Sequence, residues 1–231
     1  MPITVVGLDG DDTLWHNETR FILTQGELRD LLHRHVPEAD VVRNLFETEM
    51  KNLGMYGYGI KSFTLSMIET AIQLTEGRIP ASDLEVILGW GKRMLMMPTE
   101  LLDGVEPALR ELSTRYDLLL ITKGDLFDQE SKLARSGLAD LFLGVDILSE
   151  KNVAAYRAVL ARRGIKTEEF VMVGNSLRSD IVPVLELGAQ AVHIPYHVTW
   201  HHEHVPEESL PRSGWHRIAG ISELSRLLAE L

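Results

Sequence analysis

Apolar and polar positions divide the chain into segments of different periodicity. The first apolar run, Ile3–Leu8, is short and rich in β-branched residues, which predicts a buried strand. From about Asn17 to Leu102 the apolar positions instead recur at three- and four-residue spacings, the period of amphipathic helices. Helices are expected near Ser62–Leu74 and Ala81–Met97, among others. The pattern therefore predicts an all-helical insert without strands.

Beyond Pro107, short apolar runs alternate with amphipathic stretches. Strands are expected at Leu118–Thr122, Leu141–Leu148, Phe170–Val173 and Gln190–Ile194. Helices are expected at about Glu106–Arg115, Phe127–Ser136, Asn152–Arg163 and Asp180–Leu187, and a glycine follows each of the last three. Strands that alternate with helices imply a parallel sheet with right-handed crossovers. The predicted fold is α/β: a three-layer, Rossmann-like core of residues 1–16 and 103–231, with an inserted helical domain of residues 17–102.

Charge and composition narrow the class of ligand. The 231 residues include 23 basic and 34 acidic ones, giving a net charge of −11, so neither nucleic acid nor an anionic membrane surface is expected as a partner. There is no Cys, which excludes disulfides, cysteine nucleophiles and Cys-ligated metals. An anionic ligand must be bound by a local cation, a metal or backbone amides. Neither a signal peptide nor a membrane-length apolar run is recognisable, so we expect a cytoplasmic protein.

Polar residues of particular kinds follow the predicted strands at their carboxyl ends. They are Asp9, Asp11 and Thr13 after the first strand, Thr122, Lys123 and Gly124 after the second, Lys151 beyond the third, and Asn175 and Asp180 after the fourth. In a parallel sheet these ends meet at one edge, where ligands bind. Carboxylates, a hydroxyl, free amides and an ammonium group together suit phosphoryl transfer, which depends mostly on positioning and charge neutralisation.

These residues resemble the four motifs of the haloacid dehalogenase (HAD) superfamily, which consists mostly of Mg²⁺-dependent phosphatases. Asp9-x-Asp11-x-Thr13 resembles the first motif, Thr122 the second, Lys151 the third, and Gly174-Asn175 with Asp180 the fourth. The motifs occur in the expected order, each beside a predicted strand. The helical insert lies between the first and second motifs, where that family carries its helical cap.

The resemblance implies a catalytic role for several of these residues. Asp9 is expected to attack phosphorus and form an aspartyl-phosphate, while Asp11 protonates the leaving group and later activates water. Thr122 is expected to bind phosphoryl oxygens, and Lys151 to offset the charge of the phosphate and of Asp9. The expected ligands of Mg²⁺ are the side chain of Asp9 and the backbone carbonyl of Asp11. Asn175 and Asp180 are expected to complete or support this metal site, with either of them as the direct ligand. The substrate is expected to be a small phosphorylated metabolite.

Further substrate contacts are expected at the strand ends and in the insert. Thr13, Lys123 and Gly124 are placed near the phosphate, with Lys123 serving through its amide while its side chain points away. Tyr56 and Tyr58 lie in a glycine-rich stretch of the insert. That stretch is either a substrate-specificity loop or a tight connection between helices with surface tyrosines.

Other activities of the superfamily remain as alternatives. A phosphotransferase or mutase, and a noncatalytic phosphate-binding protein, would keep the same fold. Dehalogenation is disfavoured by Asp11, because a halide leaving group needs no proton. A phosphonatase would need a cap lysine as a Schiff base, for which Lys51, Lys61 and Lys92 are available.

The histidine-rich segment 193–204 has two interpretations. His197 and His201 are four residues apart, a spacing that would suit metal binding from one helical face. The flanking Pro195 and Pro206 favour a loop instead, packed on the active-site edge by Tyr196 and Trp200. We prefer the loop.

Overall fold

The computed structural model describes residues 2–211 and 213–231. They form two compact units. The core unit comprises Met1–Glu18, Thr99–Lys123 and Gln129–Leu231, and the helical unit comprises Thr19–Pro98 and Gly124–Asp128. The helical unit thus includes a short piece of chain that follows the second strand of the sheet. The domain bounds expected from the sequence, residues 17 and 102, remain a prediction.

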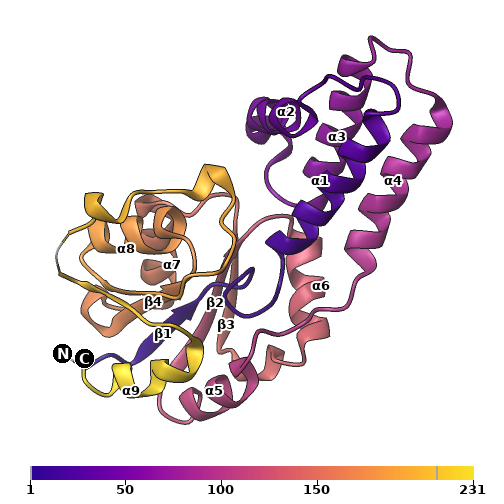
Figure 1. Cartoon of the computed structure of the whole chain (residues 1–231). Helices are drawn as coiled ribbons and strands as arrows, with labels where there is room; N and C mark the ends of the chain where they lie inside the picture. Colours follow the sequence, from indigo (N-terminus) through magenta and orange to yellow (C-terminus); the bar gives the residue numbers. More distant parts are fainter. Residues whose placement is uncertain (1, 212) are drawn as a thin grey trace. The chain divides into compact units, whose positions relative to one another are not determined.

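A parallel sheet of six strands forms the centre of the core unit (Figure 1). Its strands are β1 (Val5–Leu8), β2 (Asp117–Lys123), β3 (Gly144–Leu148), β4 (Phe170–Gly174), β5 (Gln190–His193) and β6 (Trp215–Arg217). Their order is β3-β2-β1-β4-β5-β6, and every neighbouring pair is parallel. The predicted parallel α/β sheet is confirmed, and β6 is an addition that the sequence pattern did not predict.

Helices cover both faces of this sheet (Figure 1). They are α5 (Val105–Leu112), α6 (Leu126–Ser136), α7 (Val153–Arg163), α8 (Val182–Leu187) and α9 (Leu224–Leu228). Alternate residues of each strand point to opposite faces. Val6 and Leu120 pack in one hydrophobic cluster with residues of α5 and α9, whereas Val5 and Leu119 pack in another with residues of α7 and α8. This gives the three-layer arrangement that the sequence predicts.

Four helices make up most of the helical unit: α1 (Glu18–Leu32), α2 (Val41–Tyr56), α3 (Ile60–Leu74) and α4 (Ala81–Met96). They bury a hydrophobic cluster of their own, which contains residues of all four helices. No strand occurs among the described residues of this unit, as the helical periodicity predicts.

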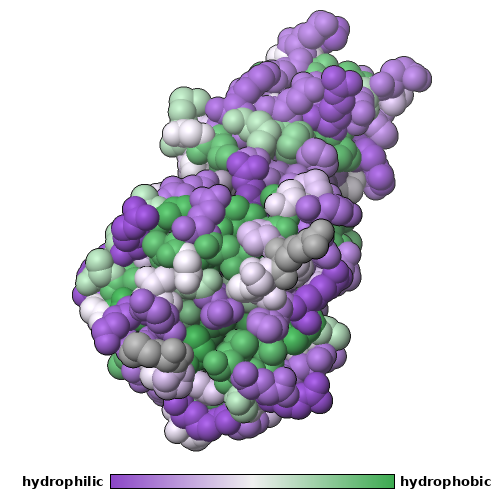
Figure 2. Space-filling view, turned by 90° about the vertical axis from the view of Figure 1, so that its left-hand side faces the viewer, coloured by the Kyte–Doolittle hydropathy of each residue, from purple (hydrophilic) through white to green (hydrophobic). Residues whose placement is uncertain are grey.

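A helix can span a membrane only if it is long enough and sufficiently apolar. In the described part of the chain, no helix combines the length and the apolar character needed to cross a bilayer. On the face shown in Figure 2, hydrophilic and hydrophobic residues are interspersed.

Candidate active site

The loop after β1 holds Asp9 at the carboxyl edge of the sheet. Its backbone N–H donates to the carbonyl oxygen of Val173 on β4 (2.9 Å), and the Thr13 hydroxyl donates to Asp9 Oδ2 (3.1 Å). Asp9 is only 6% exposed. The turn requires glycine at position 10, where a Cβ would lie 2.7 Å from the Trp15 ring. Asp9 is therefore a buried carboxylate with a fixed orientation.

Lys151 joins two buried carboxylates. Its Nζ donates to Asp9 Oδ1 (2.5 Å) and to Asp180 Oδ1 (2.7 Å). The other carboxylate oxygen of Asp180 accepts a hydrogen bond from the backbone N–H of Ser176 (3.0 Å). A Cβ at Gly174 would lie 2.2 Å from Asp180 Oδ2, so only glycine lets this carboxylate approach the end of β4.

Burial and mutual attraction set the ionisation of this group. Burial raises the pKa of Asp9 to about 7, although the ammonium of Lys151 acts in the opposite direction. Burial alone would lower the pKa of Lys151, but the carboxylates of Asp180 and Asp9 outweigh it and raise that pKa. Lys151 is therefore a permanent cation whose single charge is shared by two carboxylates. When both carboxylates are ionised, one negative charge is left in excess, which favours a bound cation.

Oxygen atoms converge beside Asp9 in a way that fits a divalent cation. One end of the Asn175 side-chain amide lies 3.2 Å from Asp9 Oδ2 and 3.1 Å from the backbone oxygen of Asp11. The amide nitrogen could donate to both oxygens from that position. If the amide oxygen occupies it, that oxygen lies from each of the other two at about the 3 Å separation of adjacent ligands in an octahedral Mg²⁺ shell. These residues therefore fit a magnesium ion.

The role of Asp180 as a metal ligand, which is expected from the sequence, remains a prediction. Both of its carboxylate oxygens have other partners, since Oδ1 accepts from Lys151 and Oδ2 accepts from the backbone of Ser176. Asp180 is 1% exposed, so it lies entirely within the protein. In this arrangement Asp180 and Asp9 both hold the ammonium group of Lys151.

Asp11 lies in a cage of hydrogen-bond donors that the sequence analysis missed. Trp15 Nε1 donates to Asp11 Oδ1 (2.6 Å), and Gln129 Nε2 donates to Oδ2 (2.9 Å). Lys132 Nζ lies 3.0 Å from each of the two oxygens. The sequence signal was the i, i+3 spacing of Gln129 and Lys132 on the helix that follows Thr122, but nothing in the chain alone indicates that this face meets Asp11.

Thr122 and Lys123, which follow one another on β2, have different partners. The buried Thr122 hydroxyl donates to Gln129 Oε1 (3.1 Å). The Lys123 side chain donates to Ser179 Oγ (2.9 Å) and to Glu203. Gly124 follows with a φ of 143°, a backbone conformation that favours glycine. The roles expected for these residues at the phosphate remain predictions.

The histidine-rich segment is a loop that a buried carboxylate anchors to the sheet edge. Glu203 accepts hydrogen bonds from Ser176 Oγ, from Ser179 Oγ (2.6 Å) and from Lys123. Burial opposes ionisation of Glu203, but the Lys123 ammonium and the two hydroxyls outweigh it and lower its pKa to about 2. Among the described residues, no cluster of three or more acidic, histidine or cysteine side chains could hold a metal.

Two further contacts tie this segment to the loops of the site. Tyr196 Oη lies 2.7 Å from His16 Nδ1, just beyond the first motif. His193 Nε2 donates to the backbone oxygen of Asn175 (3.0 Å). The predicted packing of Tyr196 against the strand-end loops thus agrees with the structure. These contacts also fix the backbone at Asn175.

The helical unit holds the two tyrosines that were predicted to contact substrate. Tyr56 ends α2 and is 49% exposed, and Tyr58 lies between two glycines of positive φ, Gly57 and Gly59. The turn is therefore a tight helix–helix connection. A contact of either tyrosine with substrate remains a prediction.

The structure does not favour any one of the three lysines of the helical unit as a Schiff-base residue. Lys61 pairs with Asp125 in the same unit, at 2.9 Å and 3.0 Å from its two carboxylate oxygens. Lys51 and Lys92 are exposed on α2 and α4.

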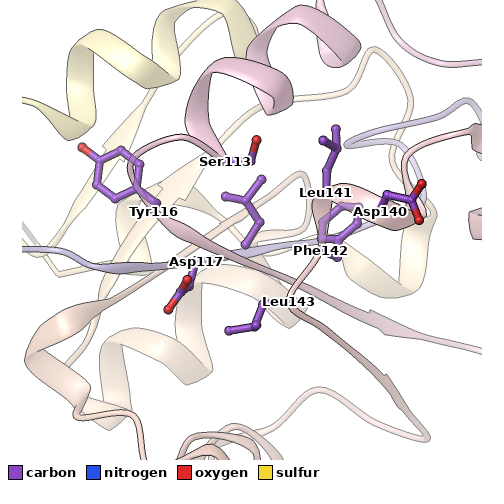
Figure 3. A pocket seen from close by; sticks show the side chains of 8 residues that line it. Ser113, Tyr116, Asp117, Asp140, Leu141, Phe142 and Leu143 are labelled. Atoms are coloured by element: carbon purple, nitrogen blue, oxygen red, sulfur yellow. The ribbon is translucent and has the colours of Figure 1, made fainter.

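A surface hollow of about 460 Å³ lies at the opposite end of the strands (Figure 3). It is lined by residues from the end of α5, the start of β2 and the segment before β3, among them Tyr116, Asp117 and Leu143. These are the amino ends of β2 and β3, so the hollow is separate from the strand-end carboxylates.

Known proteins resemble this chain in sequence and in architecture. The sequence profile of the haloacid dehalogenase-like hydrolases matches residues 3–185. The chain belongs to the haloacid dehalogenase-like hydrolase family. Among curated proteins, none matches it.

Solved structures of HAD-type hydrolases cover nearly the whole chain. A haloacid dehalogenase-like hydrolase from Xanthomonas campestris is 39% identical, with a TM-score of 0.87 over 98% of this chain and 91% of that one. The HAD hydrolase YfnB from Bacillus subtilis, described as bound to magnesium, is 16% identical, with a TM-score of 0.69 and 99% of each chain covered. A 2-haloacid dehalogenase from Pseudomonas syringae is 20% identical, with a TM-score of 0.67 and 99% of each chain covered. The latter two show the fold alone.

Proposed function

We propose that this HAD hydrolase is a Mg²⁺-dependent phosphatase that hydrolyses a small phosphomonoester through an aspartyl-phosphate on Asp9. The observation that carries the proposal is the pair Asp9 and Asp11. The first carboxylate is buried and paired with Lys151, and the second is two residues further on and hydrogen-bonded by separate partners. Two carboxylates in different surroundings provide a nucleophile and an acid–base group.

The first step forms the covalent intermediate. Asp9 attacks phosphorus through one carboxylate oxygen, and the bond from phosphorus to the leaving oxygen breaks as Asp11 supplies a proton to that oxygen. Lys151 offsets negative charge on the transferred group and keeps Asp9 oriented. A magnesium ion held by Asp9, the Asp11 carbonyl and Asn175 would neutralise phosphoryl charge when bound.

The second step returns the enzyme to its starting state. Asp11, now a carboxylate, takes a proton from water, and the resulting hydroxide attacks phosphorus. The bond between phosphorus and Asp9 breaks, and inorganic phosphate leaves. One carboxylate thus acts first as acid and then as base.

Dehalogenation is the rival activity within the family. A haloacid dehalogenase displaces halide from carbon, and a halide leaves without a proton. Asp11 would then have no acid role in the first step. The presence of a carboxylate at position 11 therefore favours phosphate transfer over halide displacement.

The two activities can be separated with purified protein. We expect phosphate release from 4-nitrophenyl phosphate with Mg²⁺, and its loss with a chelator. We expect no halide release from 2-chloropropionate. Halide release without phosphate release, or equal phosphatase rates with Mg²⁺ and chelator, would contradict the proposal.

A further inference from the structure

We propose that Gln129 and Lys132, on the helix α6, are positioning residues that orient Asp11 for proton transfer to the leaving group. This inference rests on the proposed phosphatase function and assigns residues outside the four motifs to it. The geometry behind it is the donor cage around the Asp11 carboxylate.

The cage fixes the carboxylate in one orientation. Lys132 reaches both oxygens of Asp11 at 3.0 Å, Gln129 holds one oxygen, and Trp15 holds the other. Rotation about the side-chain bonds of Asp11 would break several hydrogen bonds at once, two of which involve a full positive charge. Hydrogen bonds between charged partners are the strongest of those found in proteins.

All three donors are buried, so each has lost the hydration that a donor at the protein surface would keep. Trp15 is 0% exposed, Gln129 2% and Lys132 5%. Removing an ammonium group from water costs several kcal/mol unless it is paired with an anion. Lys132 offsets that cost with Asp11 and with the side-chain oxygen of Asn17 at 2.9 Å. An apolar residue would fill the same space without this cost.

Gln129 also connects Asp11 to the second motif. Its Nε2 donates to Asp11, and its Oε1 accepts from the Thr122 hydroxyl (3.1 Å). The Gln129 amide therefore bridges the Asp11 carboxylate and the Thr122 hydroxyl. Thr122 lies at the strand end where the phosphoryl group is expected, so Gln129 links the position of the proton donor to that end of the sheet.

Proton transfer has a kinetic signature that separates positioning from a structural role. A good leaving group departs without a proton, whereas a poor one needs Asp11. Loss of orientation should therefore slow the poor leaving groups selectively. A change that merely destabilised the protein, or weakened phosphate binding, would slow all substrates alike.

The test uses a series of para-substituted phenyl phosphates, which differ in leaving-group basicity but little in shape. We expect wild-type kcat/KM to depend weakly on basicity. Lys132→Met and Gln129→Met should steepen that dependence, with losses of about 10- to 100-fold for the most basic leaving group and much smaller ones for 4-nitrophenyl phosphate. Lys132→Arg, which keeps the charge, should restore part of the loss.

Controls make every outcome informative. Lys166→Met removes an exposed lysine near the start of β4 and should leave both rate and slope unchanged. Should Lys132→Met fail to fold, Gln129→Met carries the same test, because it breaks the link to Thr122 without removing a charge. Wild-type slopes in folded variants, or faster turnover of basic leaving groups, would overturn the inference. Absence of phosphatase activity in the wild type would instead overturn the proposed function.

Discussion

At the scale of single residues, the carboxylates of the site differ in their hydrogen-bond partners. Asp9 and Asp180 share Lys151, while Asp11 has donors of its own. The Asn175 amide lies beside Asp9 Oδ2 and the backbone oxygen of Asp11 and adds no charge there. These assignments give distinct expectations for conservative substitutions that exchange carboxylate and amide.

The first prediction concerns Asn175 and Asp180. Asn175→Asp should lower the Mg²⁺ concentration needed for half-maximal phosphatase rate, because a unit negative charge ~4 Å from the divalent ion adds ~8 kcal/mol of attraction at an effective dielectric of 20, before desolvation. Asp180→Asn should instead lower kcat and leave that concentration nearly unchanged, since Asp180 contacts Lys151. Titration of activity with Mg²⁺ measures both. A large increase in the required Mg²⁺ for Asp180→Asn would instead identify Asp180 as a ligand.

The second prediction concerns Gly174, where a methyl group has no room. Gly174→Ala places a Cβ 2.2 Å from Asp180 Oδ2, so the carboxylate must move away from Lys151. We expect a loss of about 1–3 kcal/mol in the free energy of unfolding, together with reduced kcat. Urea denaturation and phosphatase assays measure the two effects.

The matched control is Gly220→Ala. Gly220 has an extended backbone (φ −166°), and no atom lies within 4 Å of the position that a Cβ would occupy, so alanine should be neutral there. Equal stability of the two variants would show that Asp180 relocates without cost.

At the scale of elements, the sequence predicts regular segments better than their contacts. The strand Phe170–Gly174 is apolar and buried throughout, and the helices ending at Gly164 and Gly188 stop at residues of positive φ. Local chemistry decides such features. The expected strand Leu141–Leu148 is shorter in the structure, because Ala139–Leu141 forms a 3₁₀ turn and β3 begins at Gly144.

The features that the sequence does not predict share a physical cause. The strand β6 has only three residues, Trp215–Arg217, and its pairing with β5 supplies the order that its own sequence lacks. The cage around Asp11 likewise depends on which face of α6 meets the first motif. Both are consequences of tertiary packing, which periodicity does not encode.

The third prediction concerns the anchor of the histidine-rich loop. The pKa of Glu203 is lowered from 4.5 to about 2, so its ionised form stabilises the folded state above pH 4.5 and this contribution disappears as the pH falls toward 2. The shift corresponds to roughly 3 kcal/mol. Glu203→Gln should therefore destabilise the protein near pH 7, and by somewhat less than half as much near pH 3.

Unfolding midpoints of wild type and Glu203→Gln at the two pH values measure this difference. Glu168→Gln, at an exposed position, is the matched control and should behave like wild type at both. A gap between Glu203→Gln and wild type that stays constant with pH would show that the ionised carboxylate is not the anchor.

At the scale of the whole molecule, one edge of a parallel sheet gathers residues that are far apart in the sequence. Asp9 follows β1, Lys151 follows β3, and Asp180 follows β4. The chain has a net charge of −11, so a phosphate ester would meet a locally cationic site on an acidic protein. A bound magnesium ion would provide that local charge, because Lys151 is already shared by two carboxylates.

The central claim is the transfer of a phosphoryl group to Asp9, and direct trapping of the intermediate tests it. Asp11→Asn should slow hydrolysis of the intermediate, so acid quenching after incubation with 4-nitrophenyl phosphate and Mg²⁺ should preserve it. We expect peptide mass spectrometry to find a phosphoryl group on Asp9, and none in Asp9→Asn. Phosphate release without any phosphorylated protein, or a phosphoryl group on another residue, would contradict the account.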